Sequence, residues 1–344
     1  MSAPAKPPVL VARAPARLDF GGGWTDVPPY CDEEGGTVCN LAIARRATVR
    51  LRAADAASAP TERAPTGRAS DARLADAALV RAGLGTVARA DLASDFPVGA
   101  GLGGSSAAGV ALAAAVAAWK GALPAGAPDA ATRDALAEWS RAVEVEDAGI
   151  AGGRQDHYAA AYGGALRLDF GAAAGGRPAA AHPIALADAT ASALERRLLV
   201  VYTGESRISG DTITAVLDAY RAREPRVVRA LARMRALAAG MADALAAGDV
   251  DALGAQLDEH WTHQRALHPS ITTPRIDAIV AAGARAGALG AKALGASGGG
   301  CVLLLSADGR EDALRAAVGP LGEPLDFVLD REGVVVQRVP IDDP

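Results

Sequence analysis

The sequence has few cysteines and aromatic residues, no run of like charge and no long apolar stretch. Its three cysteines, Cys31, Cys39 and Cys301, are too few and too far apart for a disulfide framework, which indicates a reducing compartment. The net charge is −5 without any basic run, which argues against nucleic acids and anionic membranes as partners. No segment approaches about 18 uninterrupted apolar residues, and the first residues lack an apolar signal segment. We therefore expect a cytoplasmic protein that contacts neither nucleic acid nor membrane.

Apolar and small residues are plentiful instead. Half of the 344 residues are hydrophobic, which is enough for about two domains with sizeable cores. A patch rich in Gly, Ala and Pro at 171–183 precedes the strongly apolar segment 197–202, which indicates a domain change nearby. We expect a first domain at 1–195 and a second at 196–344. The sequence carries no indication of an oligomeric state.

Hydrophobic periodicity predicts both strands and helices, with turn residues between them. Strands are expected at 9–13, 37–43, 47–51, 165–170, 197–202, 301–305 and 333–339. Helices are expected at 105–119, 129–147, 211–222, 226–247, 250–263 and 274–286. Residues 53–72 show no periodicity and indicate an irregular excursion.

The stretch Phe96–Gly109 is the most informative part of the chain. Four glycines lead into Ser105 and Ser106 and then into an apolar helical run. Such a loop can turn its N–H groups toward an anion, and the helix that follows adds free donors and the positive end of its dipole. The segment has no Lys and is therefore not a Walker P-loop, and it makes a poor dinucleotide fingerprint. It predicts a phosphate-binding turn.

Three glycine-bearing segments, near residues 20, 100 and 298, carry polar residues and suggest one shared cleft. The attached polar residues are Arg17, Thr25 and Asp26 in the first, Ser105 and Ser106 in the second, and Glu144, Asp156 and Arg207 between the second and third. Hydroxyl and carboxylate oxygens suit Mg²⁺, which bridges to nucleotide phosphates. An Asp near an Arg is what a kinase needs to accept a proton from a hydroxyl.

These segments resemble the three signature motifs of the GHMP kinases, in the same order and over nearly the whole chain. The matching stretches are Arg13–Asp26, Pro97–Ala107 and Leu294–Cys301. Within the family, Phe20–Tyr30 and Gly153–Tyr158 resemble a branch that contains heptose 7-phosphate kinases and the kinase part of L-fucokinases. The resemblance implies a two-domain α+β fold, with a ribosomal-protein-S5 domain 2-like N-terminal domain and a ferredoxin-like C-terminal domain.

The resemblance also implies roles for individual residues. Asp156 matches the catalytic Asp, Arg17 the Arg that stabilises the alkoxide and the migrating phosphoryl group, and Glu144 an acidic metal ligand. The ATP-binding residues implied are Gly99, Gly101, Leu102, Gly103, Gly104, Ser105, Ser106 and Ala107, with Ser105 also a ligand of Mg²⁺. The substrate side implied is Gly23, Trp24, Thr25, Asp26 and Arg207, with the loop residues Gly295, Ser297, Gly298 and Gly299 facing phosphate and substrate.

The implied activity is transfer of phosphate from ATP, with Mg²⁺, to a sugar or sugar phosphate, at the anomeric hydroxyl. D-glycero-D-manno-heptose 7-phosphate is the favoured acceptor, because the segment that ends in Arg207 resembles the heptose enzyme. L-fucose is the alternative, because Trp24 resembles the fucokinases. Galactose is disfavoured, since Gly23 and Trp24 stand where galactokinases have Glu and His. A catalytically silent sugar sensor and a diphosphomevalonate-decarboxylase-like enzyme are the competing functions.

Several of these residues have a simpler interpretation. Asp156 is also consistent with a surface turn after the glycines, and Arg207 with a residue that only caps a helix. Glu144 lies one helical turn from Arg141 and is also consistent with an exposed ion pair. The His260-x-x-His263 spacing suits a metal, but without the Glu of His-Glu-x-x-His it favours an ordinary helix face.

Overall fold

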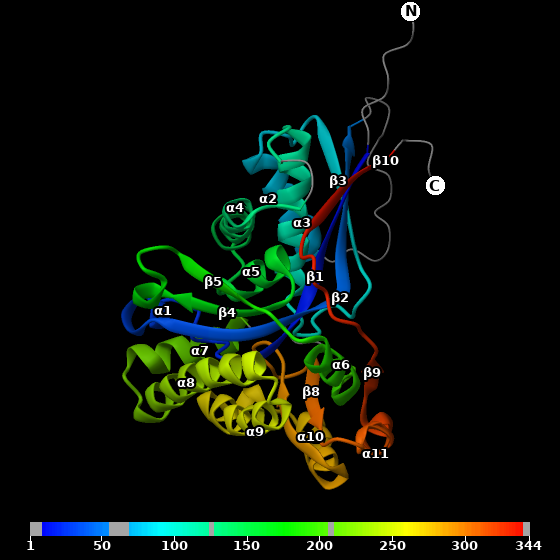
Figure 1. The fold of residues 1–344 in the computed structure, drawn as a ribbon. Helices are drawn as coiled ribbons and strands as arrows, with labels where there is room; N and C mark the ends of the chain where they lie inside the picture. The colour runs from blue at the N-terminus through cyan, green and yellow to red at the C-terminus, as the bar shows by residue number, and fades with distance from the viewer. Residues whose placement is uncertain (1–8, 55–68, 124–126, 206–209, 340–344) are drawn as a thin grey trace, which may run out of the picture.

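The computed structural model describes residues 9–54, 69–123, 127–205 and 210–339, and these form two antiparallel sheets with helices packed against them (Figure 1). The first sheet has the order β10-β1-β2-β4-β5, with β3 paired to β2. Its strands are β1 (Val9–Gly21), β2 (Gly36–Ala53), β3 (Ala88–Ser94), β4 (Ala165–Phe170), β5 (Ala179–Ile184) and β10 (Val335–Val339). The second sheet has the order β7-β8-β6-β9, made of β6 (Leu198–Tyr202), β7 (Ala288–Ala293), β8 (Cys301–Ser306) and β9 (Glu323–Leu325). The predicted two-domain α+β fold is confirmed.

The first half of the described chain contributes helices that lie between its strands along the sequence. They are α1 (Tyr30–Glu34), α2 (Ala69–Arg81), α3 (Gly104–Trp119), α4 (Ala130–Ala142), α5 (Gln155–Tyr162) and α6 (Asp188–Arg197), with a π-helical turn at Val143–Asp147 after α4. The central helix is α3, which packs against β1, β2, α4 and α5. Its Ala-rich sequence is apolar on nearly every side, as a helix buried on nearly every side must be.

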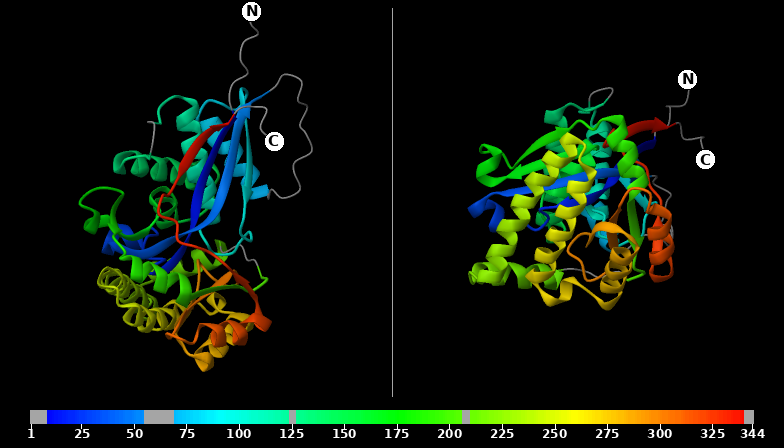
Figure 2. Two further views of the ribbon diagram at one scale, coloured as in Figure 1. Left: turned by 45° about the vertical axis from the view of Figure 1, so that its right-hand side comes forward. Right: turned by 60° about the horizontal axis from the view of Figure 1, so that its bottom comes forward.

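The helices of the second half are α7 (Gly210–Arg221), α8 (Pro225–Ala247), α9 (Val250–Leu267), α10 (Pro274–Ala286) and α11 (Glu311–Val318). Short 3₁₀ turns lie at Gly171–Ala174, Pro269–Ile271 and Gly319–Leu321. The α8 helix contacts β1, β2 and β4, so the second half rests against one end of the first sheet (Figure 2). The predicted start of α10 is confirmed, because the Thr273 side chain accepts a hydrogen bond from the Ile276 N–H and Pro274 is the first helical residue. None of the helices in the described ranges is long and apolar enough to cross a membrane.

The strands that flank the first glycine segment are longer than predicted. The sequence predicts a strand that ends at Arg13, whereas β1 continues to Gly21 through a register shift between Pro15 and Ala16. Proline has no N–H for the ladder and is tolerated in a strand at such an irregularity. Likewise, the two strands predicted at 37–43 and 47–51 are one strand, β2. Because β1 extends to Gly21, it includes Arg17 and places this residue next to the glycine loop.

Nine α-helices and strands of the described chain are absent from the sequence prediction, namely α1, α2, α5, α6, α11, β3, β5, β7 and β9. Three of them illustrate the reasons. The α2 and α6 helices are rich in Ala and short polar residues, which weakens the apolar periodicity that identifies a helix. The β5 strand lies at a sheet edge and contains Pro183, which sequence rules associate with a turn. Residues 69–72 of the expected excursion are therefore helical, and residues 55–68 lie outside the described part of the chain.

The end of the chain returns to the first sheet. Strand β10 pairs with β1, from Val9 opposite Val339 to Arg13 opposite Val335 (Figure 1). The expected division at residue 195 stays a prediction, but the last strand of the second half belongs to the sheet of the first half. The two halves are thus joined by the chain in two places.

Two glycine clusters meet backbone to backbone where the halves touch. The Cys301 N–H donates to the Ala100 carbonyl at 2.8 Å. A Cβ added at Gly101 would lie 2.5 Å from the Leu294 carbonyl oxygen, and one at Gly300 would lie 2.8 Å from that of Ala100. Real side chains do not approach backbone this closely, so the glycines are required by contact between the halves as well as by the turn itself.

Because the two glycine clusters touch, we expect Gly101→Ala and Gly309→Ala to lower the free energy of unfolding by different amounts. Gly101 and Gly309 have φ near +74° and +73°, but the space around Gly309 is open. Gly309→Ala is expected to cost only the left-handed strain, about 1–2 kcal/mol, whereas Gly101→Ala adds a clash with the Leu294 carbonyl and costs more. Denaturant unfolding of both variants measures the difference. Equal losses would contradict the close packing of the two glycine clusters.

Candidate active site

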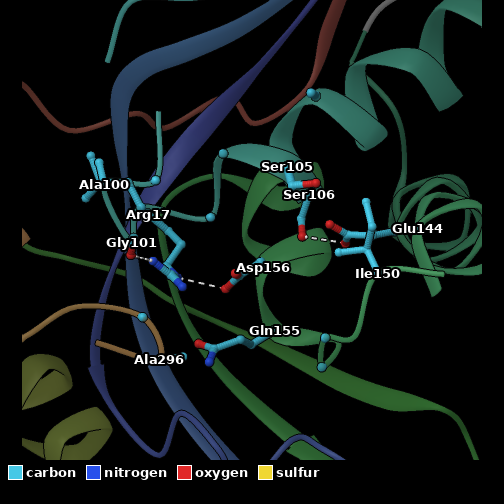
Figure 3. Close-up of a pocket in the computed structure, with 18 of the residues that line it drawn as sticks. Arg17, Ala100, Gly101, Ser105, Ser106, Glu144, Ile150, Gln155, Asp156 and Ala296 are labelled. Carbon is cyan, nitrogen blue, oxygen red and sulfur yellow. Dashed lines mark hydrogen bonds and ion pairs between the residues drawn. The ribbon is translucent and has the colours of Figure 1, made fainter. Parts of the chain in front are cut away.

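A cavity of about 770 Å³ lies where the two glycine clusters meet (Figure 3). It is lined mainly by the first half, from β1, the loop after it, the glycine loop, the start of α3, the π-helical turn and the start of α5. The second half contributes Ile213, Gly295 and Ala296. Most of the residues predicted to act on substrate or nucleotide therefore face one space.

Arg17 and Asp156 form an ion pair inside this cavity. The Arg17 Nε lies 2.8 Å from Asp156 Oδ1, and Arg17 Nη1 donates to the Gly101 carbonyl at 2.6 Å (Figure 3). Arg17 is buried, whereas the Asp156 side chain is 26% exposed and faces the open part of the cavity. An arginine hydrogen-bonded to the glycine loop thus holds a carboxylate that borders the cavity.

The glycine loop presents a helix N-terminus with free donors. Gly103, with φ of +74°, is the N-cap of α3, and no side chain caps the helix there. The first-turn N–H groups of α3 therefore lack a side-chain acceptor and suit an anionic ligand. A Cβ at Gly103 would come within 3.2 Å of the Asp156 carboxyl carbon, so the glycine lets the loop pass directly beside the carboxylate.

Glu144 and two serines form a set of oxygen donors at the same end of the cavity. Ser106 Oγ donates to Glu144 Oε2 at 3.0 Å, and the exposed Ser105 is the next residue along the cavity wall (Figure 3). His157 Nε2 lies 2.9 Å from Glu144 Oε2, and its Nδ1 contacts Ser140 Oγ at 2.9 Å. Burial would raise the pKa of the Glu144 carboxyl, but hydrogen bonds from His157 and the serines hold it below the ordinary value. Glu144 is buried and is not the exposed partner of Arg141 that the sequence left open.

Asp26 caps the helix that carries Asp156. Its Oδ2 accepts hydrogen bonds from the N–H groups of Arg154 at 2.9 Å and Gln155 at 3.0 Å. Burial raises the pKa of Asp26 to about 6. The like charges of Asp156 and Asp19 also raise this pKa, whereas the hydrogen bond from the Gln155 N–H lowers it. Gly153 passes so close that any Cβ there would overlap Asp26. The carboxylate thus fixes the position of α5.

Asp19 and Lys292 form a buried ion pair that joins the two sheets beneath the cavity. The Lys292 Nζ lies 2.9 Å from Asp19 Oδ2 and 2.7 Å from the Asp19 carbonyl oxygen, and both residues are at most 2% exposed. Although burial alone raises the pKa of Asp19, the charges of Lys292 and Arg17 outweigh it and hold that pKa below its ordinary value. Asp19 lies on β1 and Lys292 on β7, so the pair also fixes the two sheets relative to each other.

The remaining predicted residues are divided between the cavity wall and the structure behind it. Those that line the cavity are Gly23, Trp24, Gly99, Gly101, Leu102, Gly103, Gly104 and Gly295. Thr25 lies behind the wall, fully buried, with its hydroxyl donating to the Gly22 carbonyl at 2.7 Å. Ala107, Ser297, Gly298 and Gly299 also lie outside the lining, and Arg207 lies outside the described residues.

Ser297 belongs to the second glycine cluster, and its backbone has a conformation typical of glycine. Its φ is +69°, a left-handed value that serine rarely adopts. The Ser297 Oγ accepts a hydrogen bond from Gln264 Nε2 at 3.0 Å, which holds the side chain beneath the loop. Ser297 therefore supports the second glycine cluster and does not face the cavity.

Four further polar residues of the site were not assigned a function from the sequence. Asp19 follows Arg17 by two residues, which on a strand places both on one face. Lys292 is a lone charge in an apolar strand and so requires a buried partner. Gln155 and His157 flank Asp156 on α5, but their roles depend on Gly23 and Glu144, which are distant in sequence. Only the first two carried a signal that sequence reasoning could have used.

The His260-x-x-His263 pair does not form a metal centre. His260 is fully buried and its Nε2 accepts a hydrogen bond from the Gly22 N–H at 2.9 Å. Burial lowers the pKa of His260 to about 3, so it is neutral. Within the described ranges, no group of three or more His, Cys, Asp or Glu side chains is placed to hold a metal ion.

Comparison with known families identifies the class to which this fold and site belong. The model of the GHMP kinases N terminal domain matches residues 72–164, and the model named GHMP kinases C terminal matches residues 241–320. Together the two models cover half of the chain. The chain belongs to the GHMP kinase family, as its three motifs predicted.

The more similar relatives are enzymes that act on sugars. The chain is 27% identical to D-glycero-alpha-D-manno-heptose 7-phosphate kinase of Campylobacter jejuni, over 72% of this chain and 69% of that protein. It is 29% identical to the bifunctional fucokinase/GDP-fucose pyrophosphorylase of Arabidopsis thaliana over 86% of this chain, which spans 29% of that longer enzyme. Its fold resembles that of a D-glycero-D-manno-heptose 1-phosphate kinase from Bacteroides thetaiotaomicron, with a TM-score of 0.72, 22% identity and coverage of 96% and 99% of the two chains.

The raised pKa of Asp26 predicts a specific pH dependence of stability. A carboxyl whose folded pKa of about 6 exceeds its unfolded value of about 3.9 stabilises the protein below pH 4, and this contribution disappears as pH rises through 6. Two pKa units correspond to about 3 kcal/mol. The difference in unfolding free energy between wild type and Asp26→Asn is therefore expected to fall by about that amount between pH 4 and pH 7.5, measured by denaturant titration.

Asp129→Asn is the matched control, because Asp129 also caps a helix through its side chain but is exposed. Its hydrogen bonds to Thr132 lower the pKa of Asp129, so its contribution is lost only as pH falls below about 4. Its difference from wild type is expected to stay constant over the same pH range. A constant difference for Asp26→Asn as well would show that Asp26 is not buried against other carboxylates.

Proposed function

We propose that this GHMP kinase transfers the terminal phosphate of ATP, with Mg²⁺, to the anomeric hydroxyl of a sugar. The observation that carries the proposal is the Arg17–Asp156 ion pair, placed within one cavity beside the uncapped N-terminus of α3. Asp156 accepts or orients the proton of the attacking hydroxyl, and Arg17 stabilises the charge that develops on the oxygen. Three buried, free cysteines support the cytoplasm as the proposed compartment.

The residues of the site fit ATP and Mg²⁺. The α3 N–H groups have no side-chain cap, and the residues at this helix start line the cavity, so phosphate oxygens can approach them there. Ser105, Ser106 and Glu144 supply hard oxygen donors at the same end of the cavity, and these would hold Mg²⁺. The bound metal would neutralise charge on the transferred phosphate. His157 keeps Glu144 ionised and oriented for that role.

D-glycero-D-manno-heptose 7-phosphate is the acceptor that we favour. The resemblance of the segment that ends in Arg207 supports it, as does the Campylobacter relative that is named for this substrate. L-fucose is the alternative, supported by Trp24 in the cavity wall and by the fucokinase relative. A silent sugar sensor is a weaker candidate, because Arg17, Glu144 and Asp156 are all present and in contact with partners that orient them.

Removal of the proposed base is the most direct test. Asp156→Asn keeps the size of the side chain but cannot accept the proton, and it is expected to reduce kcat by about 10²–10⁴-fold. ADP release is measured with heptose 7-phosphate, L-fucose, galactose and mevalonate. The matched control is Asp308→Asn, at an exposed aspartate that pairs with Arg196 far from the cavity, and it should keep full activity. ADP release from no sugar, or full activity in Asp156→Asn, would refute the mechanism.

The metal role of Glu144 has a separate prediction. Glu144→Gln removes the charge but keeps the shape, and it is expected to raise the Mg²⁺ concentration for half-maximal ADP release by about tenfold or more. Glu146→Gln is the control on the same π-helical turn, because Glu146 is exposed and pairs with Arg81. The measurement is ADP release over a range of Mg²⁺ concentrations. Identical curves for the two variants would remove Glu144 from the metal site.

A further inference from the structure

Three buried polar atoms in the wall of the cavity have no hydrogen-bond partner among the described residues. They are Asp19 Oδ1, Gln155 Oε1 and Trp24 Nε1, and their residues are between 2% and 8% exposed. A buried polar atom left without a partner costs about 1–3 kcal/mol, so native structures seldom keep several of them together. Two unpaired acceptors and one unpaired donor among the described residues of one cavity wall point to a ligand that carries hydroxyl groups.

The first two of these atoms lie beside the reacting pair. Arg17 and Asp19 are two residues apart on β1 and so share one face of the strand, about 6.6 Å apart along its axis. Gln155 and Asp156 are neighbours in the first turn of α5. A Cβ at Gly23 would lie 2.5 Å from Asp19 Oδ2 and 3.0 Å from Gln155 Nε2, so both side chains converge over that glycine. The two elements that join Arg17 to Asp156 thus also place Asp19 next to Gln155.

The two aspartates nearest to Gly23 differ in what their oxygens already bind. Asp26 Oδ2 accepts two backbone N–H groups at the start of α5, so that oxygen is occupied by the helix it caps. Asp19 uses only Oδ2 for Lys292 and keeps Oδ1 free. Since Lys292 keeps Asp19 charged, Oδ1 can only accept a hydrogen bond, and acceptance by a charged oxygen is the stronger kind.

We propose that Asp19 and Gln155 recognise the sugar, each accepting a hydrogen bond from a hydroxyl next to the one that is phosphorylated. This rests on the proposed function and names the residues that select its acceptor. Trp24 Nε1 supplies the complementary donor. Lys292 is a positioning residue, because it holds Asp19 and does not line the cavity. Asp26, for which the resemblance implies contact with sugar hydroxyls, also lines the cavity, and its Oδ2 caps α5.

The test compares two glutamines whose Oε1 has no hydrogen-bond partner in the described part of the chain, one in the cavity wall and one away from the cavity. Gln155 and Gln256 each have an Oε1 without a partner among the described residues, but Gln256 packs against Gly240 between α8 and α9, away from the cavity. Gln155→Met is expected to raise the acceptor KM about 3–10-fold and to leave the ATP KM unchanged. Gln256→Met should change neither. Both are measured by ADP release with the intact protein and whichever of L-fucose and heptose 7-phosphate is turned over.

The test of Asp19 replaces two residues at once, because Asp19→Asn alone leaves the Lys292 charge buried without a partner and destabilises the fold. The double variant Asp19→Asn/Lys292→Met removes that charge, and its fold is checked by circular dichroism. The folded variant is expected to raise the acceptor KM about 10–100-fold. Monodeoxy analogues of the active sugar then separate recognition from structural damage. In wild type, one deoxy sugar should bind more weakly than its parent sugar. In Gln155→Met, the two sugars should bind equally well.

Equilibrium binding distinguishes a failure of this inference from a failure of the proposed function. Titration calorimetry with L-fucose and heptose 7-phosphate, without ATP, is carried out on wild type and on the same variants. Sugar binding that weakens in Gln155→Met but without any ADP release would refute the kinase and support the recognition site. Turnover with an unchanged acceptor KM in both variants, or binding of neither sugar, would overturn the assignment of Asp19 and Gln155.

Discussion

The contact between two glycine clusters is the constraint on which the rest of this structure depends. Gly101 lies against the Leu294 carbonyl and Gly300 against that of Ala100, distances that no residue with a Cβ allows. Because the backbones touch, the N-terminus of α3 and the loop after β7 face the same cavity. Arg17 is fixed to the same loop through the Gly101 carbonyl, and it in turn holds Asp156. The glycine loop and the Arg17–Asp156 ion pair are therefore positioned by one contact.

Four carboxylates around the cavity carry different tasks because their partners differ. Asp156 is paired with Arg17 and remains partly exposed, which leaves its carboxylate accessible from the cavity. Glu144 is buried with His157 and Ser106, which keeps it charged among oxygen donors. Asp26 is buried against backbone N–H groups and other carboxylates, and burial raises its pKa to about 6. Asp19 is charged because Lys292 and Arg17 offset the cost of its burial.

Much of the fold was predictable where local chemistry alone decides it. The α3 and α10 helices and the strands β4, β6 and β8 follow from apolar periodicity with turn residues or caps at their ends. The prediction was wrong where tertiary pairing overrides a local signal. Strand β1 runs through Pro15 because a register shift absorbs the proline, and β5 forms at an edge that tolerates Pro183. The α2 and α6 helices were missed because Ala-rich segments carry little amphipathic contrast.

The sequence by itself determined the family, since short motifs such as Pro97–Ala107 identify it in consecutive residues, and it predicted a phosphate-binding turn. Only the tertiary structure decided which of those residues face the cavity and which support it. Thr25 and Ser297 proved to lie behind the wall, while Asp19 and Gln155 lie in it. The reason is physical: a side chain's role depends on partners distant in sequence, such as Lys292 for Asp19, and burial makes those partners obligatory.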